Sequence, residues 1–344
     1  HLLHMQSRLV PDMFMKFSNR YELLIAIKVN QPVGRKTLLN FINMTERQLR
    51  TECEVLSKLG LITKKATGMS VTEKGEELLF EIKESVINDS FAKERSFIKN
   101  HFSIKQVHIV AGDFVNNEAT REEMTNLLLD KVNAKITKEC VIGVSGGSTM
   151  YYIAGRANET FGYGKDVTIT PIRGGLSVVN TEYQANDIAS KMAKNSGHSS
   201  QLLHAPDNIG QKALEELKKE PVVKNALDVI GKTSIIIHSI GNAFEMAYRR
   251  KSSKDILKVL EEKKAVCESF GSYFDESGSE IFKTSTIGMS FKDVDGIDNV
   301  FTIVGGEEKA DAVYSYLNTK PANATLIIDE AICKKIIKKV NKNF

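Results

Sequence analysis

The sequence predicts an α/β protein in two parts: a small, mostly helical N-terminal module and a larger Rossmann-like domain built on a parallel sheet. Three observations lead to this prediction. A chain of 344 residues is too long for one ordinary hydrophobic core. Basic residues are concentrated at the start, where residues 1–72 hold 11 Lys and Arg against 5 Asp and Glu. From residue 107 onward, short apolar runs alternate with helical patterns, which is typical of parallel sheets.

The composition excludes several classes of protein. With 42% hydrophobic and 26% charged residues, and no apolar run near the ~20 residues of a membrane span, we expect a cytoplasmic protein that has no membrane partner. The four cysteines are scattered, with no C-x-x-C pair and no His pair near them. We therefore expect free buried thiols rather than disulfides or zinc ligands, and neither a metal nor a cofactor.

The order of elements in residues 1–88 is typical of a winged helix-turn-helix domain. A first helix is expected to begin at Ser18 or Asn19, followed by a short second helix. Thr45 is a good N-cap for a third helix, because a Gln three residues later completes a capping box. Two strands near residues 61–71 form the wing. A basic module of this kind indicates nucleic-acid binding.

In a winged helix-turn-helix domain the third helix enters the major groove by its N-terminal residues. Arg47 and Arg50 can contact guanine edges or phosphates, and Gln48 can contact adenine. Lysines on the wing suit phosphates. The alternative is a surface helix whose charges are merely solvated. The expected DNA-binding residues are Thr45, Glu46, Arg47, Gln48, Arg50, Lys64 and Lys65.

Residues 89–106 are predicted to form a linker helix, and residues 107–344 the larger domain. Ligands of open α/β sheets bind at the carboxyl ends of the strands, so the residues that follow each strand are candidates for a site. The expected strands are residues 107–110, 140–144, 167–172, 234–238, 299–304 and 324–328. Glycine loops and basic residues follow several of them, which favours a binding site at one sheet edge.

The stretch from Gly146 to Thr149 is the strongest single candidate. A glycine turn leads there from an apolar strand into a helix, whose first N–H groups have no partner inside the helix. Such a helix start suits a phosphate or a carboxylate. It matches neither nucleotide-binding glycine motif. The alternative is an ordinary helix cap after a tight turn.

Several motifs, taken in order, resemble those of the SorC-type sugar-operon repressors, a family of bacterial transcription regulators, over nearly the whole chain. The stretches that carry the resemblance are Tyr21–Leu24, Ile42–Leu49, Gly68–Gly75, Gly146–Thr149, Pro171–Gly175, Gly241–Ala243, Arg249–Arg250, Glu268–Gly271 and Val304–Lys309. The resemblance implies a DNA-binding repressor that recognises a palindromic or repeated operator as a homodimer or homotetramer. It implies no catalytic residue.

The resemblance also implies that the larger domain has the fold of sugar-phosphate isomerases and glucosamine-phosphate deaminases. It would bind a phosphorylated sugar as an effector, fructose-1,6-bisphosphate in the nearest members of the family. The implied effector contacts are Gly146, Gly147, Ser148, Thr149, Arg173, Gln184, Arg250, Glu268 and Lys309. The choice of Arg250 over its neighbour Arg249 stays open.

The competing hypothesis is a sugar-phosphate isomerase with an appended DNA-binding module. Aldose–ketose isomerisation needs a carboxylate base beside the substrate. The stretch from Asp295 to Asp298 superficially resembles the D-G-A-D stretch of those enzymes. It precedes a strand instead of following one, which favours a surface turn and a protein that is not an enzyme.

Overall fold

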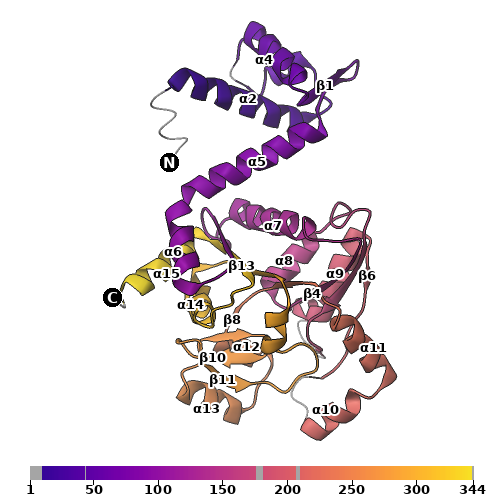
Figure 1. The fold of residues 1–344 in the computed structure, drawn as a ribbon, viewed down its shortest axis with the longest axis vertical. Coiled ribbons are helices and arrows are strands. Elements are labelled where there is room, and N and C mark those ends of the chain that lie inside the picture. Colours follow the sequence, from indigo (N-terminus) through magenta and orange to yellow (C-terminus); the bar gives the residue numbers. More distant parts are fainter. Residues whose placement is uncertain (1–9, 43, 176–180, 207–209, 343–344) are drawn as a thin grey trace. The chain divides into compact units, whose positions relative to one another are not determined.

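The computed structural model describes residues 10–42, 44–175, 181–206 and 210–342. The chain divides into two compact units, residues 1–92 and 93–344 (Figure 1). This boundary lies within the predicted linker region, residues 89–106. Each unit has its own hydrophobic core and is described separately.

The smaller unit has the winged helix-turn-helix order that the sequence predicts. Its elements are α2 (Pro11–Asn30), α3 (Arg35–Leu38), α4 (Glu46–Lys58), β1 (Ile62–Lys65), β2 (Gly68–Val71) and α5 (Glu73–Ser90). The wing is antiparallel, with Ile62 opposite Val71. Apolar side chains of α4 are buried at Leu49, Cys53 and Leu56. This apolar face, together with residues of α2 and the wing, forms the core of the unit.

Two helix starts in this unit test the capping predictions. At α4 the capping box is present: the Thr45 N–H donates to Gln48 Oε1 at 2.9 Å, and the Gln48 N–H donates to Thr45 Oγ1 at 3.3 Å. The predicted start at Ser18 or Asn19 is wrong, because α2 begins at Pro11. Proline suits the first helical position, since its N–H would have no partner there.

The larger unit is built on a sheet of seven parallel strands. These are β3 (Gln106–Val110), β4 (Glu139–Val144), β5 (Asp166–Pro171), β6 (Ser199–Ser200), β7 (Ile235–His238), β12 (Asn299–Val304) and β13 (Ala324–Asp329). The six strands expected from the sequence are all present, and the two-residue β6 is additional. Along the sheet the order is β3-β13-β12-β7-β4-β5-β6.

This strand order creates a switch point between β4 and β7. From β4 the chain proceeds to β5 and β6 toward one edge, and from β7 it proceeds to β12 and β13 toward the other. Crevices at such points are the usual ligand sites of open α/β sheets.

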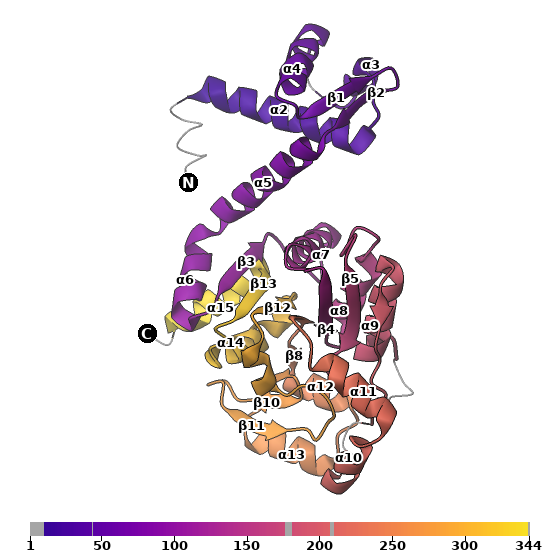
Figure 2. The same ribbon diagram turned by 45° about the vertical axis from the view of Figure 1, so that its right-hand side comes forward.

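Helices cover both faces of the sheet (Figure 2). The helices of the larger unit are α6 (Ala92–Phe102), α7 (Glu118–Asn133), α8 (Ser148–Arg156), α9 (Ala185–Ser196), α10 (Gln211–Leu217), α11 (Pro221–Ile230), α12 (Ala243–Arg249), α13 (Lys254–Glu262), α14 (Ala310–Asn318) and α15 (Glu330–Lys342). Apolar side chains of α7, α8 and α9 join alternate strand residues, such as Ile142 and Ile303, in one core. On the opposite face Thr302 of β12 meets Tyr316 of α14.

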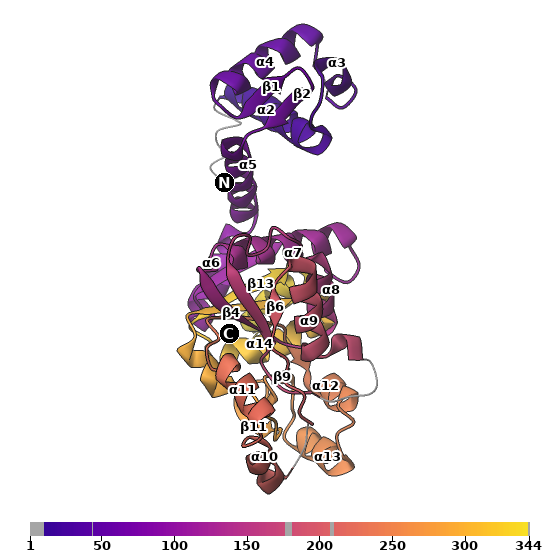
Figure 3. The ribbon, with the colours of Figure 1, turned by 90° about the vertical axis from the view of Figure 1, so that its right-hand side faces the viewer.

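A second, antiparallel sheet is inserted between β7 and β12. Its strands are β8 (Gly241–Asn242), β9 (Cys267–Ser269), β10 (Ser272–Phe274) and β11 (Glu280–Lys283), in the order β11-β10-β9-β8. With α12 and α13 it forms a small layer beside the carboxyl edge of the parallel sheet (Figure 3). Its strands have two to four residues, so they leave little pattern in the sequence.

The described residues include no helix that is long and apolar enough to cross a membrane. The same residues hold no group of three or more His, Cys, Asp or Glu side chains placed to bind a metal. All four cysteines are free and buried.

Candidate effector site and nucleic-acid interface

A cavity of about 420 Å³ lies at the switch point, beyond the ends of β4 and β7. This volume is within the usual range for small-molecule sites. All nine implied effector contacts line it: Gly146, Gly147, Ser148 and Thr149 after β4, Arg173 after β5, Gln184 before α9, Arg250 after α12, Glu268 on β9, and Lys309 before α14. The parallel sheet and the inserted sheet therefore both contribute to the site.

The loop before α8 is held in place by backbone contacts. The Ser145 N–H donates to Ile237 O at 3.1 Å, and the Ser239 N–H donates to Ser145 Oγ at 3.2 Å, so the loop is tied to the end of β7. Gly147 has a φ of +121°, which side chains rarely adopt, and a Cβ at Gly146 would crowd the Tyr183 carbonyl oxygen at 2.8 Å. The two glycines are therefore required by the turn.

The start of α8 is open to an anion. The helix begins at Ser148 without a side-chain cap, so its first N–H groups lie at the cavity with the positive end of the helix dipole. The Gly147 N–H is the exception, because it donates to Tyr183 O at 2.8 Å. The N–H groups of Ser148 and Thr149 are therefore better placed to bind a phosphate than the N–H of Gly147, which already has a partner.

Lys309 lies directly beside this helix start. Its Nζ is 3.4 Å from Thr149 Oγ1. Among the residues that the structure describes, no carboxylate lies within ion-pair distance of the ammonium group. Burial lowers the pKa of Lys309, although nearby Glu308 and Glu245 oppose the shift. A bound phosphate would supply the missing counter-charge.

A second cluster of charges faces the cavity from the inserted layer. Glu268 is 5% exposed, and its Oε1 is 2.9 Å from Arg250 Nη2 and 3.4 Å from Arg173 Nη1. The Gly271 N–H donates to the same oxygen at 2.7 Å. Burial alone would raise the pKa of Glu268, but the two guanidinium groups and this hydrogen bond outweigh it and lower the pKa. The carboxylate of Glu268 therefore forms ion pairs with two largely buried arginines.

Arg249 and Arg250 both line the cavity but differ in their surroundings. Arg250 is largely buried, and its Nη1 donates to Tyr273 OH at 3.1 Å in addition to its bond with Glu268. Arg249 is more exposed and pairs with Glu245 at 2.5 Å, one helical turn earlier. Arg250 is thus part of the inner charge cluster, whereas Arg249 belongs to a solvated ion pair.

The sequence reasoning missed several residues that line the cavity. Ser145, Tyr183, Ser239, Glu245 and Tyr248 are among them. Ser145 and Ser239 are the first residues after β4 and β7. Both could have been predicted, because ligand sites of open α/β sheets lie at the carboxyl ends of the strands. The others lie on helices or turns and carry no such signal.

The predicted surface turn near Asp295 lies away from the cavity. Residues Phe291–Gly296 form a short 3-10 helix before β12, and Asp295 and Asp298 are exposed. Neither lines the cavity. The stretch is at the amino end of β12, whereas the cavity is at the carboxyl ends of the strands.

The predicted DNA-contacting side chains all lie on the surface of the smaller unit. Thr45, Glu46, Arg47, Gln48 and Arg50 are exposed at the start of α4. Arg50 pairs with Glu54 one turn later at 3.4 Å, in an exposed geometry that a phosphate or base could replace. Gln48 Oε1 accepts from both the N–H and the hydroxyl of Thr45, so the cap already occupies this oxygen.

Lys64 and Lys65 are exposed on β1. Their place on the wing, next in the chain after α4, suits contact with the phosphate backbone. The predicted DNA-binding residues therefore occur on two consecutive surface elements of one small unit, the helix start and the wing.

Comparison with family models divides the chain at nearly the same place as the structure does. A model described as "CggR N-terminal DNA binding domain" matches residues 17–86, and one described as "Putative sugar-binding domain" matches residues 87–338. The second model alone spans well over half of the chain.

The chain is also similar to individual proteins. It is 31% identical over 343 residues to the central glycolytic genes regulator of Bacillus subtilis, covering 98% of each chain. The structure of a "putative SorC family transcriptional regulator" from Enterococcus faecalis matches with a TM-score of 0.67 and 32% identity, over 71% of this chain and 99% of that one. The full-length sorbitol operon regulator SorC from Klebsiella pneumoniae shares the fold, with a TM-score of 0.62 and 14% identity, over 89% and 94% of the two chains.

Proposed function

The chain belongs to the SorC-type family of transcriptional regulators with a sugar-binding domain, and on this premise we propose that it represses glycolytic genes under the control of a phosphorylated sugar. The effector we propose is fructose-1,6-bisphosphate. The smaller unit binds operator DNA, and the cavity of the larger unit binds the sugar. The active form is a homodimer or homotetramer on a palindromic or repeated operator.

The charge of the cavity is the observation that carries this proposal. Among the residues that the structure describes, five basic side chains and two acidic ones line it, an excess of three positive charges before the helix dipole is counted. A phosphate monoester carries about −1.5 to −2 charges near neutral pH. One such group cannot balance the lining, whereas two phosphates on one sugar can.

The arrangement of these charges supports two separate phosphate positions. Thr149 and Lys309 lie together at the start of α8 and suit one phosphate. Arg173 and Arg250 lie on the other cluster, where they share the single carboxylate of Glu268 and suit a second. A sugar between them would hold the two phosphates apart.

The isomerase alternative finds less support in the cavity lining. A general base needs a carboxylate that can take up a proton near neutral pH. Glu268 is bound between two arginines and its pKa is lowered, so it is a weak base. Glu245 pairs with Arg249.

The proposed control of DNA binding is tested on the full chain. The ligand can alter operator affinity only if it binds the DNA-competent and DNA-free forms with different affinity. Fluorescence anisotropy of a labelled fragment from the glycolytic promoter is measured during titration with fructose-1,6-bisphosphate or fructose-6-phosphate. We expect release by the bisphosphate alone at physiological concentration. Equal effects of the two sugars would contradict the two-phosphate assignment, and no specific DNA binding would contradict the whole proposal.

A further inference from the structure

The loop of residues 113–115 does not line the cavity, but it contacts segments that lead to the lining residues Thr149 and Lys309. On one side are α7 and α8, and on the other is the loop of residues 305–309, which ends at Lys309. We call residues 113–115 the spacer loop. Its contacts to both sides are specific and involve residues that the proposed site does not use.

Asp329 joins the spacer loop to the loop of Lys309. This aspartate ends β13 and is fully buried. Its Oδ2 accepts the N–H of Phe114 at 2.9 Å and that of Gly306 at 2.6 Å, while Oδ1 accepts the N–H of Ile332 at 2.9 Å. A buried carboxylate is costly unless hydrogen bonds satisfy it. Here the three hydrogen bonds come from the spacer loop, the loop of residues 305–309 and the start of α15. The carboxylate therefore fixes these three segments relative to one another.

Close packing reinforces this link. A Cβ on Gly305 would overlap the Cβ and ring of Phe114, and a Cβ on Gly306 would crowd Val115. Gly306 has a φ of +101°, and its carbonyl accepts the N–H of Lys309 at 3.0 Å. The backbone position of Lys309 is therefore set by Gly306, and that of Gly306 by the spacer loop.

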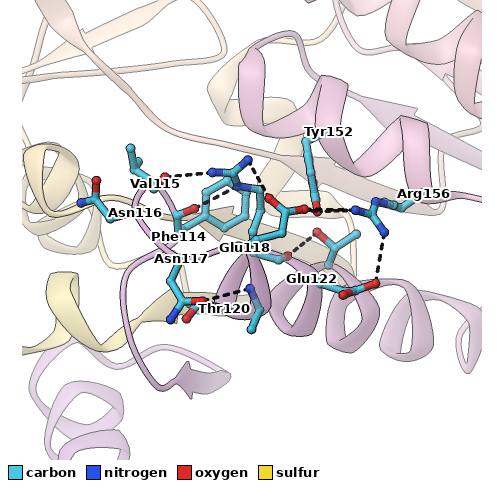
Figure 4. A network of polar contacts seen from close by, with 12 residues as sticks. Phe114, Val115, Asn116, Asn117, Glu118, Thr120, Glu122, Tyr152 and Arg156 are labelled. Carbon is cyan, nitrogen blue, oxygen red and sulfur yellow. Dashed lines mark hydrogen bonds and ion pairs between the residues drawn. The ribbon is translucent and has the colours of Figure 1, made fainter.

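On its other side the spacer loop is held by Arg121 of α7. The guanidinium donates from Nε to Phe114 O at 3.0 Å and from Nη2 to Val115 O at 2.8 Å. It also lies over the ring of Tyr152 of α8, with its carbon 5.3 Å from the ring centroid. Tyr152 OH in turn donates to Glu118 Oε1 at 2.6 Å (Figure 4). The helix that carries Thr149 is thereby connected to the spacer loop.

Taking the proposed function as its basis, we infer that Asp329 and Arg121 are positioning residues for the effector. They hold the spacer loop between α8 and the loop of residues 305–309, and thereby keep Lys309 Nζ beside Thr149. Lys309 and the start of α8 then meet the same phosphate. Neither Asp329 nor Arg121 lines the cavity, so neither touches the ligand.

Arg156 offers a matched control. It belongs to the same polar network, binds Glu118 and Glu122 at 3.1 Å each, and lies over the ring of Tyr152 at 5.1 Å. Among the described residues it has no hydrogen bond to the spacer loop (Figure 4). Arg156→Met should therefore remove an arginine from the network without releasing the loop.

The first test is a set of double-mutant cycles on the full chain. Affinity for fructose-1,6-bisphosphate is measured by calorimetry for Asp329→Asn, Arg121→Met and Arg156→Met, each with Lys309 present and with Lys309→Met. With Lys309 present, we expect Asp329→Asn and Arg121→Met each to weaken effector binding about tenfold. In the Lys309→Met background the same two changes should weaken binding by less than about twofold. Arg156→Met should have little effect in either background. Equal losses in both backgrounds would overturn the inference.

The second test needs no ligand. The rate at which an amine-reactive ester acylates Lys309 is followed by peptide mass spectrometry. We expect faster acylation in Asp329→Asn and Arg121→Met than in wild type, and no change in Arg156→Met. Unchanged rates in the first two variants would overturn the inference.

If wild type does not bind the bisphosphate, the proposed effector is wrong, and the acylation test still decides the role of the spacer loop. Should Asp329→Asn fail to fold, Arg121→Met, at a half-buried position, decides in the same way.

Discussion

Replacing Glu268 by Gln should make the ligand-free protein less stable and its stabilisation by the effector larger. The substitution keeps the shape of the side chain but removes the charge that Arg173 and Arg250 share. The two guanidinium groups would then lose the negative charge that lies between them. A phosphate bound between them would restore the balance.

The magnitude follows from the burial of the cluster. Removing one partner of a buried ion pair typically costs about 3–5 kcal/mol. The side chains of Arg173 and Arg250 keep 10% and 15% exposure, and the Gln oxygen can still accept the Gly271 N–H, so we expect the lower end, about 3 kcal/mol. For a unit of this size that corresponds to a fall in Tm of about 6–12 °C.

The assay is thermal unfolding of the full chain with and without fructose-1,6-bisphosphate. The rise in Tm on adding ligand should be larger for Glu268→Gln than for wild type, because the phosphate replaces the lost charge. Glu245→Gln is the control: it breaks only the exposed pair with Arg249, which should change stability by less than about 1 kcal/mol. An unchanged Tm together with lost ligand binding would refute this reasoning and indicate that Glu268 binds a sugar hydroxyl directly.

Four further predictions concern the effector cavity and the DNA-binding surface. The pKa of Glu268 is lowered in the folded state, so its ionised carboxylate stabilises the fold above the unfolded pKa of about 4.5, and this effect is lost as the pH falls through the folded pKa. The difference in Tm between wild type and Glu268→Gln should therefore become smaller as the pH is lowered. A difference that stays constant with pH would contradict this prediction. Thr149→Ala should weaken effector binding by about 1.5–3 kcal/mol in calorimetry while operator binding persists, because one donor to a phosphate is lost; unchanged affinity would remove this hydroxyl from the site. Arg250→Ala should narrow the affinity difference between fructose-1,6-bisphosphate and fructose-6-phosphate, since the second phosphate loses a partner; an equal difference in wild type and variant would argue against that role. In the smaller unit, Arg50→Ala should weaken operator binding by about 1–3 kcal/mol if Arg50 contacts a base. Lys64→Ala should reduce the salt dependence of operator affinity by the equivalent of about one phosphate contact. Anisotropy titrations that are unchanged in both variants would contradict the predicted DNA contacts.

Local sequence signals were sufficient for the order of elements in the smaller unit and for six strands of the parallel sheet. The capping box at Thr45 and Gln48 is a contact between residues three apart, so it can be recognised without the fold. The six predicted strands of the larger unit are runs of apolar residues that are buried on both sides of a covered sheet, and such runs are visible in the sequence. The start of α2 was mispredicted because Ser and Asn favour helix caps, whereas here Ser18 and Asn19 lie inside a helix that begins at Pro11.

The glycine loop and the basic residues at strand ends could likewise be named in advance. Strands that run parallel place the residues after them at one edge of the sheet, which is why Thr149, Arg173 and Lys309 could be expected near one another. The residues of the inserted layer, Arg250 and Glu268, were proposed through a family resemblance alone. Their strands and turns are too short to predict from pattern.

Only the tertiary structure decided which charges oppose each other. Glu268 lies 95 positions from Arg173 in the chain, and its position between two arginines depends on how the inserted sheet packs against the parallel one. Asp329 likewise accepts hydrogen bonds from Phe114, 215 positions earlier in the chain, and from Gly306, 23 positions earlier. Such contacts arise from strand order and layer packing, which no local pattern encodes. The sequence by itself therefore determined the longer elements of this protein and the chemistry of the loops after its strands, whereas the fold determined the inserted sheet and which residues form pairs.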